Sequence, residues 1–306
     1  MRTSRGWRRA AAVLLVVVAE IWPARAQQTF KAGVDLVRVP VVVTGKDGLL
    51  TRGLTAKDFD VREDGVPQTI TTFAEGAPGD DLPLHLGLLL DVSGSMELDL
   101  RDAANAAVQF ITGLDEATDA TLVEFASTIR LGRFSRESYP TLFERIRNHK
   151  PDGDTALFDA IGVYLETART RPGQHVLLLY TDGGDNSSKL TFAQLVDALR
   201  FSNVLVYAVG YLDNQSGPQR VVQQSRLTML TRETGGDAFF PGSKRDLQTA
   251  YARILDELGS RYTIGYEPAG PRGDGRFHKI QVHLTAPAAR DVKIRTRSGY
   301  LAPGRK

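Results

Sequence analysis

The residues that could do chemistry lie where two apolar runs stop. The segment LLLDVSGSM, residues 88–96, passes from leucines directly to Asp91, and Ser93 and Ser95 follow at two-residue spacing. Asp182 ends a second such run, LLLYTD. Carboxylate and hydroxyl oxygens are the ligands that hard cations such as Mg²⁺ prefer. An aspartate followed by a Ser-Gly-Ser turn is also ordinary turn and helix-cap chemistry, so neither segment alone establishes a metal site.

The sequence from Pro83 to about Arg261 alternates apolar runs with amphipathic segments. Continuous runs such as HVLLLYTD and VLVYAVG are typical of strands that are buried on both faces. Two helices are expected shortly before Arg261, and four others at residues 97–112, 139–147, 155–169 and 192–200. This alternation predicts an α/β fold with a doubly wound, mostly parallel sheet of the Rossmann-like kind. Ligands bind at the carboxyl ends of the strands in such sheets, where Asp91 and Asp182 lie.

Both ends of the chain predict β-structure. Alternating valines beginning at Val37 predict one strand, and DFDVREDGVPQTITTF predicts a strand, an E-D-G turn and a second strand. Pro40 cannot donate to a ladder, so its strand should lie at a sheet edge or carry the proline on an unpaired side. Neither end has enough strands to be stable alone. We therefore expect residues 27–82 and 262–306 to pair into one β module, with the α/β domain of residues 83–261 inserted between them.

The first 26 residues have the features of a secretory signal peptide. Arginines precede the apolar stretch 10–19, and ARA at residues 24–26 resembles a signal-peptidase site. The stretch is too short to span a bilayer, and we expect no transmembrane segment after the signal is cleaved. Glu20 and Arg25 make the signal imperfect, so a retained anchor is the alternative. We expect cleavage before Gln27 and export, with the protein periplasmic, envelope-associated or secreted.

Charge and composition argue against several function classes. Residues 1–26 hold five of the 38 basic residues and one of the 36 acidic residues, so the remaining chain is nearly neutral. A nearly neutral protein has no general electrostatic reason to bind nucleic acid. The chain has no cysteine, which excludes disulfides and thiolate metal sites. The five histidines form no metal-spaced motif, so we interpret them as scattered polar residues.

Three segments resemble, in order and spacing, the metal-ion-dependent adhesion site of von Willebrand factor A-type domains. They are DVSGSM at 91–96, GDTALFDAI at 153–161 and YTDGGD at 180–185. The D-x-S-x-S pattern, the threonine and the aspartate of the family are matched in turn by Asp91, Ser93, Ser95, Thr155 and Asp182. The flanking β segments resemble a bacterial group of exported proteins related to the same domain. The resemblance then covers nearly the whole chain after the signal segment.

The resemblance implies a divalent metal ion, Mg²⁺ or alternatively Mn²⁺ or Ca²⁺, at these five residues. In the family the hydroxyl groups bind the ion directly and the aspartates act largely through water, so the ion keeps positive character toward an open position. An acidic side chain of a protein partner can complete the shell. Asp154 departs from the family, which commonly has glycine there. A third carboxylate would pull the site toward Ca²⁺, weaken its attraction for an acidic partner, or point to solvent.

We therefore expect an exported module, not an enzyme, that binds a protein partner through the metal ion. The sequence contains no G-x-G-x-x-G, P-loop or G-x-S-x-G motif to support catalysis. Two alternatives stay open: a hydrolase in which the metal activates water with Asp91 or Asp182 as base, and a structural envelope protein with a silent metal site.

A basic stripe near the C-terminus has two interpretations. Basic side chains alternate there with apolar ones along two predicted strands, which is the pattern either of a surface for anionic glycans or lipid headgroups or of the solvated face of a two-sided sheet. The stripe consists of Lys279, His283, Lys293, Arg295 and Arg297.

Overall fold

A computed structural model describes residues 36–76, 83–268, 274–285 and 291–302. The predicted signal peptide, residues 1–26, lies outside the described residues. The described strands form three sheets, one of six strands and two of four strands. Among the helices in these ranges, none is long and apolar enough to cross a membrane.

The six-stranded sheet has the strand order β10, β9, β8, β5, β6, β7. Neighbouring strands are parallel except β6 and β7. β5 is central and buried along its whole length, as expected for an unbroken apolar run. The predicted doubly wound, mostly parallel sheet is confirmed. Its strands are β5 (Leu84–Asp91), β6 (Ala117–Phe125), β7 (Ile129–Ser135), β8 (Gln174–Thr181), β9 (Val204–Gly210) and β10 (Ala238–Phe239).

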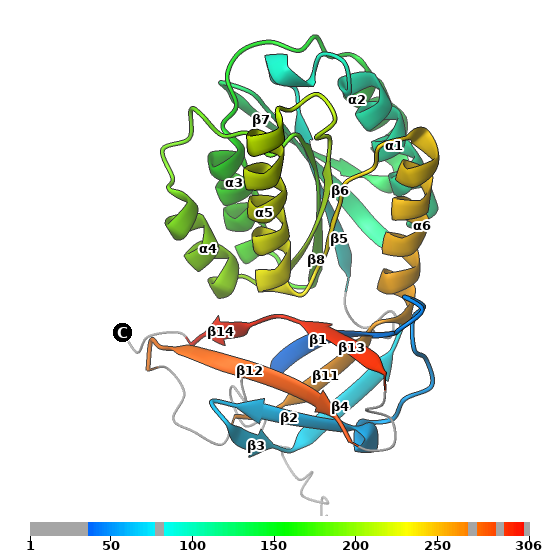
Figure 1. The fold of residues 1–306 in the computed structure, drawn as a ribbon, viewed down its shortest axis with the longest axis vertical. Helices are drawn as coiled ribbons and strands as arrows, with labels where there is room; N and C mark the ends of the chain where they lie inside the picture. The colour runs from blue at the N-terminus through cyan, green and yellow to red at the C-terminus, as the bar shows by residue number, and fades with distance from the viewer. Residues whose placement is uncertain (1–35, 77–82, 269–273, 286–290, 303–306) are drawn as a thin grey trace, which may run out of the picture. The chain divides into compact units, whose positions relative to one another are not determined.

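Helices cover both faces of this sheet (Figure 1). Leu86 and Leu88 of β5 belong to the hydrophobic cluster of α1, α2 and α6, whereas Leu89 belongs to the cluster of α3, α4 and α5. This division follows from the two-residue period of a strand, which sends neighbouring side chains to opposite faces. The helices are α1 (Leu100–Gly113), α2 (Tyr139–Arg147), α3 (Leu157–Arg169), α4 (Phe192–Phe201), α5 (Gly217–Thr234) and α6 (Lys244–Ser260).

Two helices begin later than predicted. α1 begins at Leu100 rather than at residue 97, because the 3₁₀ turn Gly94–Met96 precedes it. α3 begins at Leu157 rather than at Thr155. Of the residues left outside the two helices, Thr155 belongs to the candidate metal site, whereas residues 97–99 form a turn between the 3₁₀ turn and α1.

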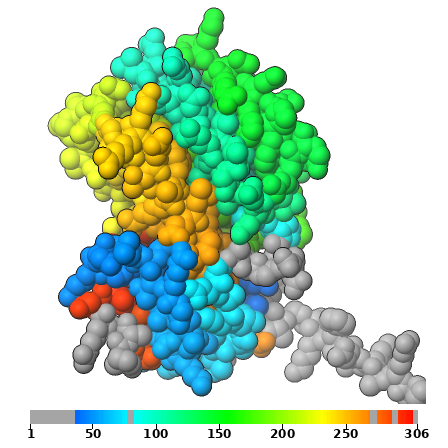
Figure 2. Space-filling view, turned by 90° about the vertical axis from the view of Figure 1, so that its right-hand side faces the viewer, coloured from blue at the N-terminus to red at the C-terminus, as the bar shows by residue number. Residues whose placement is uncertain are grey.

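The two ends of the described chain form a composite β module, as predicted. β1 pairs with β11 and β13, and β2 pairs with β12. Figure 2 shows atoms of the N-terminal strands, in blue, beside atoms of the C-terminal strands, in red. The sheet orders are β13, β1, β11, β4 and β14, β12, β2, β3. The apolar faces of both sheets share one cluster, which includes Val39, Phe59, Ile264 and Ile280.

Each end of the chain contributes four strands to the β module. From the N-terminal segment come β1 (Val37–Gly45), β2 (Phe59–Glu63), β3 (Val66–Gln68) and β4 (Ile70–Glu75). From the C-terminal segment come β11 (Tyr262–Tyr266), β12 (Phe277–Leu284), β13 (Val292–Thr296) and β14 (Gly299–Leu301).

Two details of the predicted β-structure need correction. β1 is an inner strand, so an edge position for Pro40 is wrong. The ladder to β13 begins only at Val41, however, and Pro40 is paired with Thr263 of β11 alone, which agrees with the alternative of an unpaired side. The strand predicted after the E-D-G turn is divided at Thr69, because β3 pairs with β2 whereas β4 pairs with β11 in the other sheet.

The predicted basic stripe is not one surface. Lys279 and His283 lie on β12, whereas Lys293 and Arg295 lie on β13 of the other sheet. Arg297 is buried and donates to the Asn203 side chain at 2.9 Å. Both interpretations of the stripe are therefore wrong for the two arginines, which face the α/β region instead of solvent.

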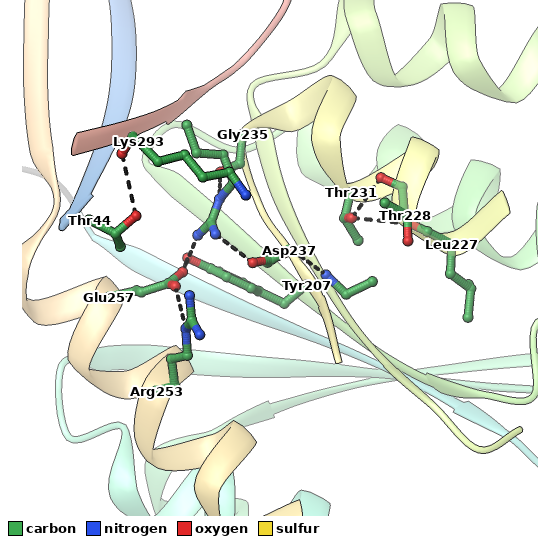
Figure 3. Close-up of polar contacts among 12 residues, drawn as sticks. Thr44, Tyr207, Leu227, Thr228, Thr231, Gly235, Asp237, Arg253, Glu257 and Lys293 are labelled. Carbon is green, nitrogen blue, oxygen red and sulfur yellow. Dashed lines mark hydrogen bonds and ion pairs between the residues drawn. The ribbon is translucent and has the colours of Figure 1, made fainter. Parts of the chain in front are cut away.

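Arg295 belongs to a buried polar network around Glu257 of α6. Glu257 is fully buried, and it accepts hydrogen bonds from Tyr207 and Arg253 (Figure 3). Arg295 forms ion pairs with Glu257 and with Asp237, which follows α5. A buried carboxylate needs such partners because burial removes its hydration. The network therefore ties β13 to the α/β region.

We expect Arg295→Met to lower the free energy of unfolding by about 2 to 4 kcal/mol, because Glu257 would stay buried without its principal cation. Lys293→Met is the matched control. Lys293 lies on the same strand and is exposed, so its replacement should change stability by less than about 0.5 kcal/mol. Urea unfolding of both variants measures the difference, and equal stabilities would show that the network contributes nothing.

Candidate metal-binding site

Asp91 lies at the carboxyl end of β5 with both carboxylate oxygens occupied. Its Oδ1 accepts hydrogen bonds from the Ser93 backbone N–H at 3.0 Å and from the Ser93 hydroxyl at 2.5 Å. Its Oδ2 accepts from the Thr181 hydroxyl at 2.6 Å. Thr181 ends β8, the neighbour of β5. Asp91 is thus fixed by its own loop and by the adjacent strand.

The two serines lie side by side, as their spacing predicts. The Ser93 and Ser95 hydroxyl oxygens are 3.1 Å apart. Ser93 is fully buried, whereas Ser95 is exposed in the 3₁₀ turn. A chain of oxygens therefore runs from the buried Asp91 through Ser93 to the surface at Ser95.

The second segment reaches this place through the loop before α3. The Gly94 N–H donates to the Gly153 carbonyl at 3.1 Å, which joins the first and second segments. Gly153 has a φ of +80°, and a Cβ there would lie 2.6 Å from the Ser127 hydroxyl, so only glycine is accommodated. The loop then brings Thr155, which is 5% exposed, beside the first segment.

The backbone of Thr155 is held by the loop that follows Asp182. Its N–H donates to Asn186 Oδ1 at 2.7 Å, and its carbonyl accepts from the N–H groups of Asn186 and Ser187 at 3.0 and 3.1 Å. Among the described residues, no hydrogen bond to the Thr155 hydroxyl is formed. Thr155 lines a cavity, so its hydroxyl is available to a ligand there.

Asp182 completes the set from the end of β8. It is 3% exposed, and its carboxylate accepts from the Gly184 N–H and from the Gln215 side chain, each at 2.8 Å. Ser95, Thr155 and Asp182 line one cavity of about 490 Å³. The structure therefore brings three of the five predicted residues to one cavity, with Asp91 and Ser93 joined to it through the Ser93–Ser95 contact.

Asp154 does not line this cavity. Its side chain is exposed and accepts from the Asn186 amide at 3.1 Å, and its N–H donates to Ser127 Oγ at 2.8 Å. Three consequences were expected for Asp154: a preference for Ca²⁺, a weaker attraction for an acidic partner, or a side chain that points to solvent. Its exposure agrees with the third.

The electrostatics of Asp91 are unusual for an aspartate. Burial raises the pKa of its carboxyl to about 7, and the charge of Asp182 adds to the rise, while the hydrogen bonds from Ser93 and Thr181 oppose it. In the described ranges no lysine, arginine or histidine forms an ion pair with Asp91 or Asp182. Two buried carboxylates beside three hydroxyls, without a protein cation, are a donor set suited to a hard divalent ion.

Comparison with known proteins assigns the family. The family model described as von Willebrand factor type A domain matches residues 85–253, more than half of the chain. The chain belongs to this family. The match spans the three segments that carry Asp91, Thr155 and Asp182, so the resemblance to a von Willebrand factor A-type domain is confirmed. No match was found among curated protein sequences.

Solved structures resemble the chain at low identity. The von Willebrand factor type A protein from Catenulispora acidiphila is 14% identical, with 88% of this chain and 74% of that chain covered and a TM-score of 0.48. A D319A mutant of the PilB minor pilin from Streptococcus sanguinis is 16% identical over 59% of this chain and 62% of that one, with a TM-score of 0.48. The pilus adhesin SpaC from Lactobacillus rhamnosus GG is 10% identical, with 82% of this chain and 49% of that chain covered and a TM-score of 0.49. The chain thus spans about three fifths of the length of the pilin.

Several residues around the von Willebrand factor A-type (VWA) cavity were not expected from the sequence. Thr181 and Gln215 hold the two site aspartates, and Asn186 holds Thr155. Arg226 of α5 also lines the cavity, with its guanidinium 5.3 Å from the centre of the Phe158 ring. Thr181 could have been suspected, because it precedes Asp182 on a predicted strand, but the other contacts depend on loop geometry.

Proposed function

We propose that this protein is an exported, non-catalytic VWA module that binds a protein partner through a divalent metal ion. The ion is held by Asp91, Ser93, Ser95, Thr155 and Asp182. The observation that supports this best is the buried Asp91 carboxylate, which forms no ion pair with the described residues. It is linked through two serine hydroxyls to a cavity that Thr155 and Asp182 also line. Export rests on the signal-like segment of residues 1–26.

Mg²⁺ is the ion that we favour, with Mn²⁺ and Ca²⁺ as alternatives. Mg²⁺ binds few protein oxygens and keeps several waters, which suits a site that is open to a cavity. When bound, the ion supplies a positive centre that accepts an additional oxygen ligand. We expect the three neutral hydroxyls to bind the ion directly and the two aspartates to act through water, as in the family, so the ion keeps positive character and an acidic side chain of a partner protein is the natural last ligand.

The cavity wall contributed by α5 suits an acidic partner. Arg226 is half-buried there and places a cation beside the rings of Phe158 and Phe192. Val222 also lines the cavity and is 55% exposed. Arginine is enriched in the cores of protein interfaces, where most other charged residues are depleted. We infer that a partner places a carboxylate in the cavity and packs apolar groups on Val222.

A hydrolase is less well supported by the same cavity. A metal-activated water needs a proton acceptor within reach. The carboxylates that line the cavity are Asp182 and Asp185, and Asp185 already accepts hydrogen bonds from the Phe158 N–H and the Ser188 hydroxyl. Asp91 is fully buried below the serines. These contacts favour ligand binding over proton transfer.

Affinity capture from an envelope extract, in Mg²⁺ and in chelator, tests the proposed function. Capture of the partner should occur in Mg²⁺ and disappear in chelator. If capture is unchanged in chelator, the proposed function is wrong, and a structural role with a silent metal site is the alternative that remains.

The same capture assay tests Arg226. Arg226→Gln should weaken partner binding about tenfold, because a charge-assisted hydrogen bond is worth roughly 1.5 kcal/mol or more, and it should leave Mg²⁺ affinity unchanged. Arg232→Gln, an exposed site on the same helix, is the matched control and should bind like the parent. Equal affinities for both variants would remove Arg226 from the interface.

A further inference from the structure

A second group of possible metal ligands lies in the β module, at the turn between β2 and β3. Glu63 ends β2, Asp64 begins the turn, and His278 lies on β12 beside them. The Asp64 N–H donates to the Lys279 carbonyl at 2.9 Å, and the Lys279 N–H donates to Asp64 Oδ1 at 2.8 Å. These contacts fix the turn against β12. Asp64 has a φ of +50°, a conformation that aspartate tolerates better than most residues.

Three side chains point one donor atom each at a common centre. His278 Nδ1 lies 2.9 Å from Asp64 Oδ2 and 3.6 Å from Glu63 Oε1. All three atoms lie within 4.8 Å of one another. Tetrahedral ligands at about 2.0 to 2.1 Å from a zinc ion are roughly 3.3 to 3.5 Å apart, so small side-chain movements bring the three atoms to ligand spacing.

The opposite atom of each of these side chains is anchored. Glu63 Oε2 accepts from the hydroxyls of Tyr266 and Tyr300, at 2.7 and 3.1 Å. Glu63 is 7% exposed, and its Oε1 accepts no hydrogen bond from the described residues. His278 Nε2 lies 3.2 Å from Asp274 Oδ1. Metal-binding histidines commonly donate their second N–H to a carboxylate in this way, which fixes the tautomer and the ring orientation.

We propose that Glu63, Asp64 and His278 form a second metal site, which binds a transition-metal divalent ion such as Zn²⁺. The imidazole nitrogen favours such an ion over Mg²⁺, which prefers oxygen alone. The ion takes the place of the proton on His278 Nδ1 and offsets the charges of two carboxylates. Its remaining position is open to water. The Tyr300 ring, whose centre lies 5.4 Å from that of His278, covers the imidazole.

This site is independent of the VWA cavity, so each can be tested without the other. In the Asp182→Ala background, calorimetric titration of the full mature chain with Zn²⁺ should show one site. His278→Gln should weaken Zn²⁺ binding at least 30-fold, and Asp64→Asn, which tolerates the same backbone conformation, should weaken it similarly. Asp274→Asn should cost about tenfold, the usual effect of removing an outer partner. His283→Gln, exposed on the same strand, is the matched control and should bind like the parent.

Co²⁺ provides a readout that a merely structural role would not produce. Bound to the parent, Co²⁺ should give the visible absorption of a low-coordinate site, and this absorption should be missing in His278→Gln. A circular dichroism spectrum and a urea unfolding midpoint like those of the parent confirm that the His278→Gln variant is folded. Absence of Zn²⁺ binding by the parent, or equal Zn²⁺ affinity in the parent, His278→Gln and Asp64→Asn, would overturn the proposal and leave an ion pair between His278 and the carboxylates.

Discussion

Asp91→Asn should stabilise the metal-free protein at pH 8 while it abolishes Mg²⁺ binding. Burial raises the pKa of the Asp91 carboxyl to about 7, compared with about 3.9 in an unfolded chain. Between these two values the folded protein binds more protons than the unfolded one, so the free energy of unfolding falls as pH rises. The asparagine amide can still accept from Ser93 and donate to the Thr181 hydroxyl, and it carries no charge.

The sign of this effect can be measured against pH. The stability that protonated Asp91 contributes is complete below about pH 4 and is lost as pH rises to about 7. The parent should therefore lose about 2 to 3 kcal/mol relative to Asp91→Asn between pH 5 and pH 8, in chelator. Mg²⁺ at pH 8 should restore the stability of the parent and not affect the variant. Parallel pH profiles of the two proteins in urea unfolding would contradict the raised pKa.

Thr155→Val should abolish partner capture and leave the fold intact. Valine has nearly the shape of threonine, and the lost hydroxyl makes no hydrogen bond to the described residues. The backbone contacts with Asn186 and Ser187 remain. We therefore expect a change in unfolding free energy below about 1 kcal/mol together with at least a tenfold loss of Mg²⁺ affinity.

Thr128→Val is the control for this substitution, since Thr128 is exposed in a nearby loop and does not line the cavity. It should capture the partner as the parent does. If Thr155→Val captures the partner normally in Mg²⁺, the hydroxyl is not a ligand, and the interaction surface lies elsewhere.

The α/β fold could be predicted because its strands are continuous apolar runs. Such runs bury both faces, and β5 does so along its whole length. The composite β module was predictable for a different reason, namely that hairpins of this size are not stable alone. The late start of α1 was not predictable, because residues 97–99 have no feature that separates a first helical turn from a loop.

The five candidate residues could be selected from the sequence because their types and spacing are local features, and the cavity lined by Ser95, Thr155 and Asp182 agrees with that selection, while the metal itself stays a prediction. Gln215 and Asn186 could not, since each reaches the site from a loop whose path depends on tertiary packing. Arg295 was misread because two-residue alternation does not distinguish a solvent-facing cation from one that pairs with a buried carboxylate. The contact of His278 with Asp64 could not be predicted for a similar reason, since the two residues lie 214 positions apart in the sequence.

Calorimetric titration of Mg²⁺ into the chelator-treated protein, expressed as residues 27–306, tests the central claim most directly. The proposed site predicts one bound ion in the parent and at least a hundredfold weaker Mg²⁺ binding in Asp182→Ala. The Asp154 carboxylate contacts Asn186 and does not line the cavity, so Asp154→Gly should bind Mg²⁺ equally or more tightly. Failure of the parent to bind any divalent ion at millimolar concentration, or equal affinity in the parent and Asp182→Ala, would contradict a metal ion at these five residues.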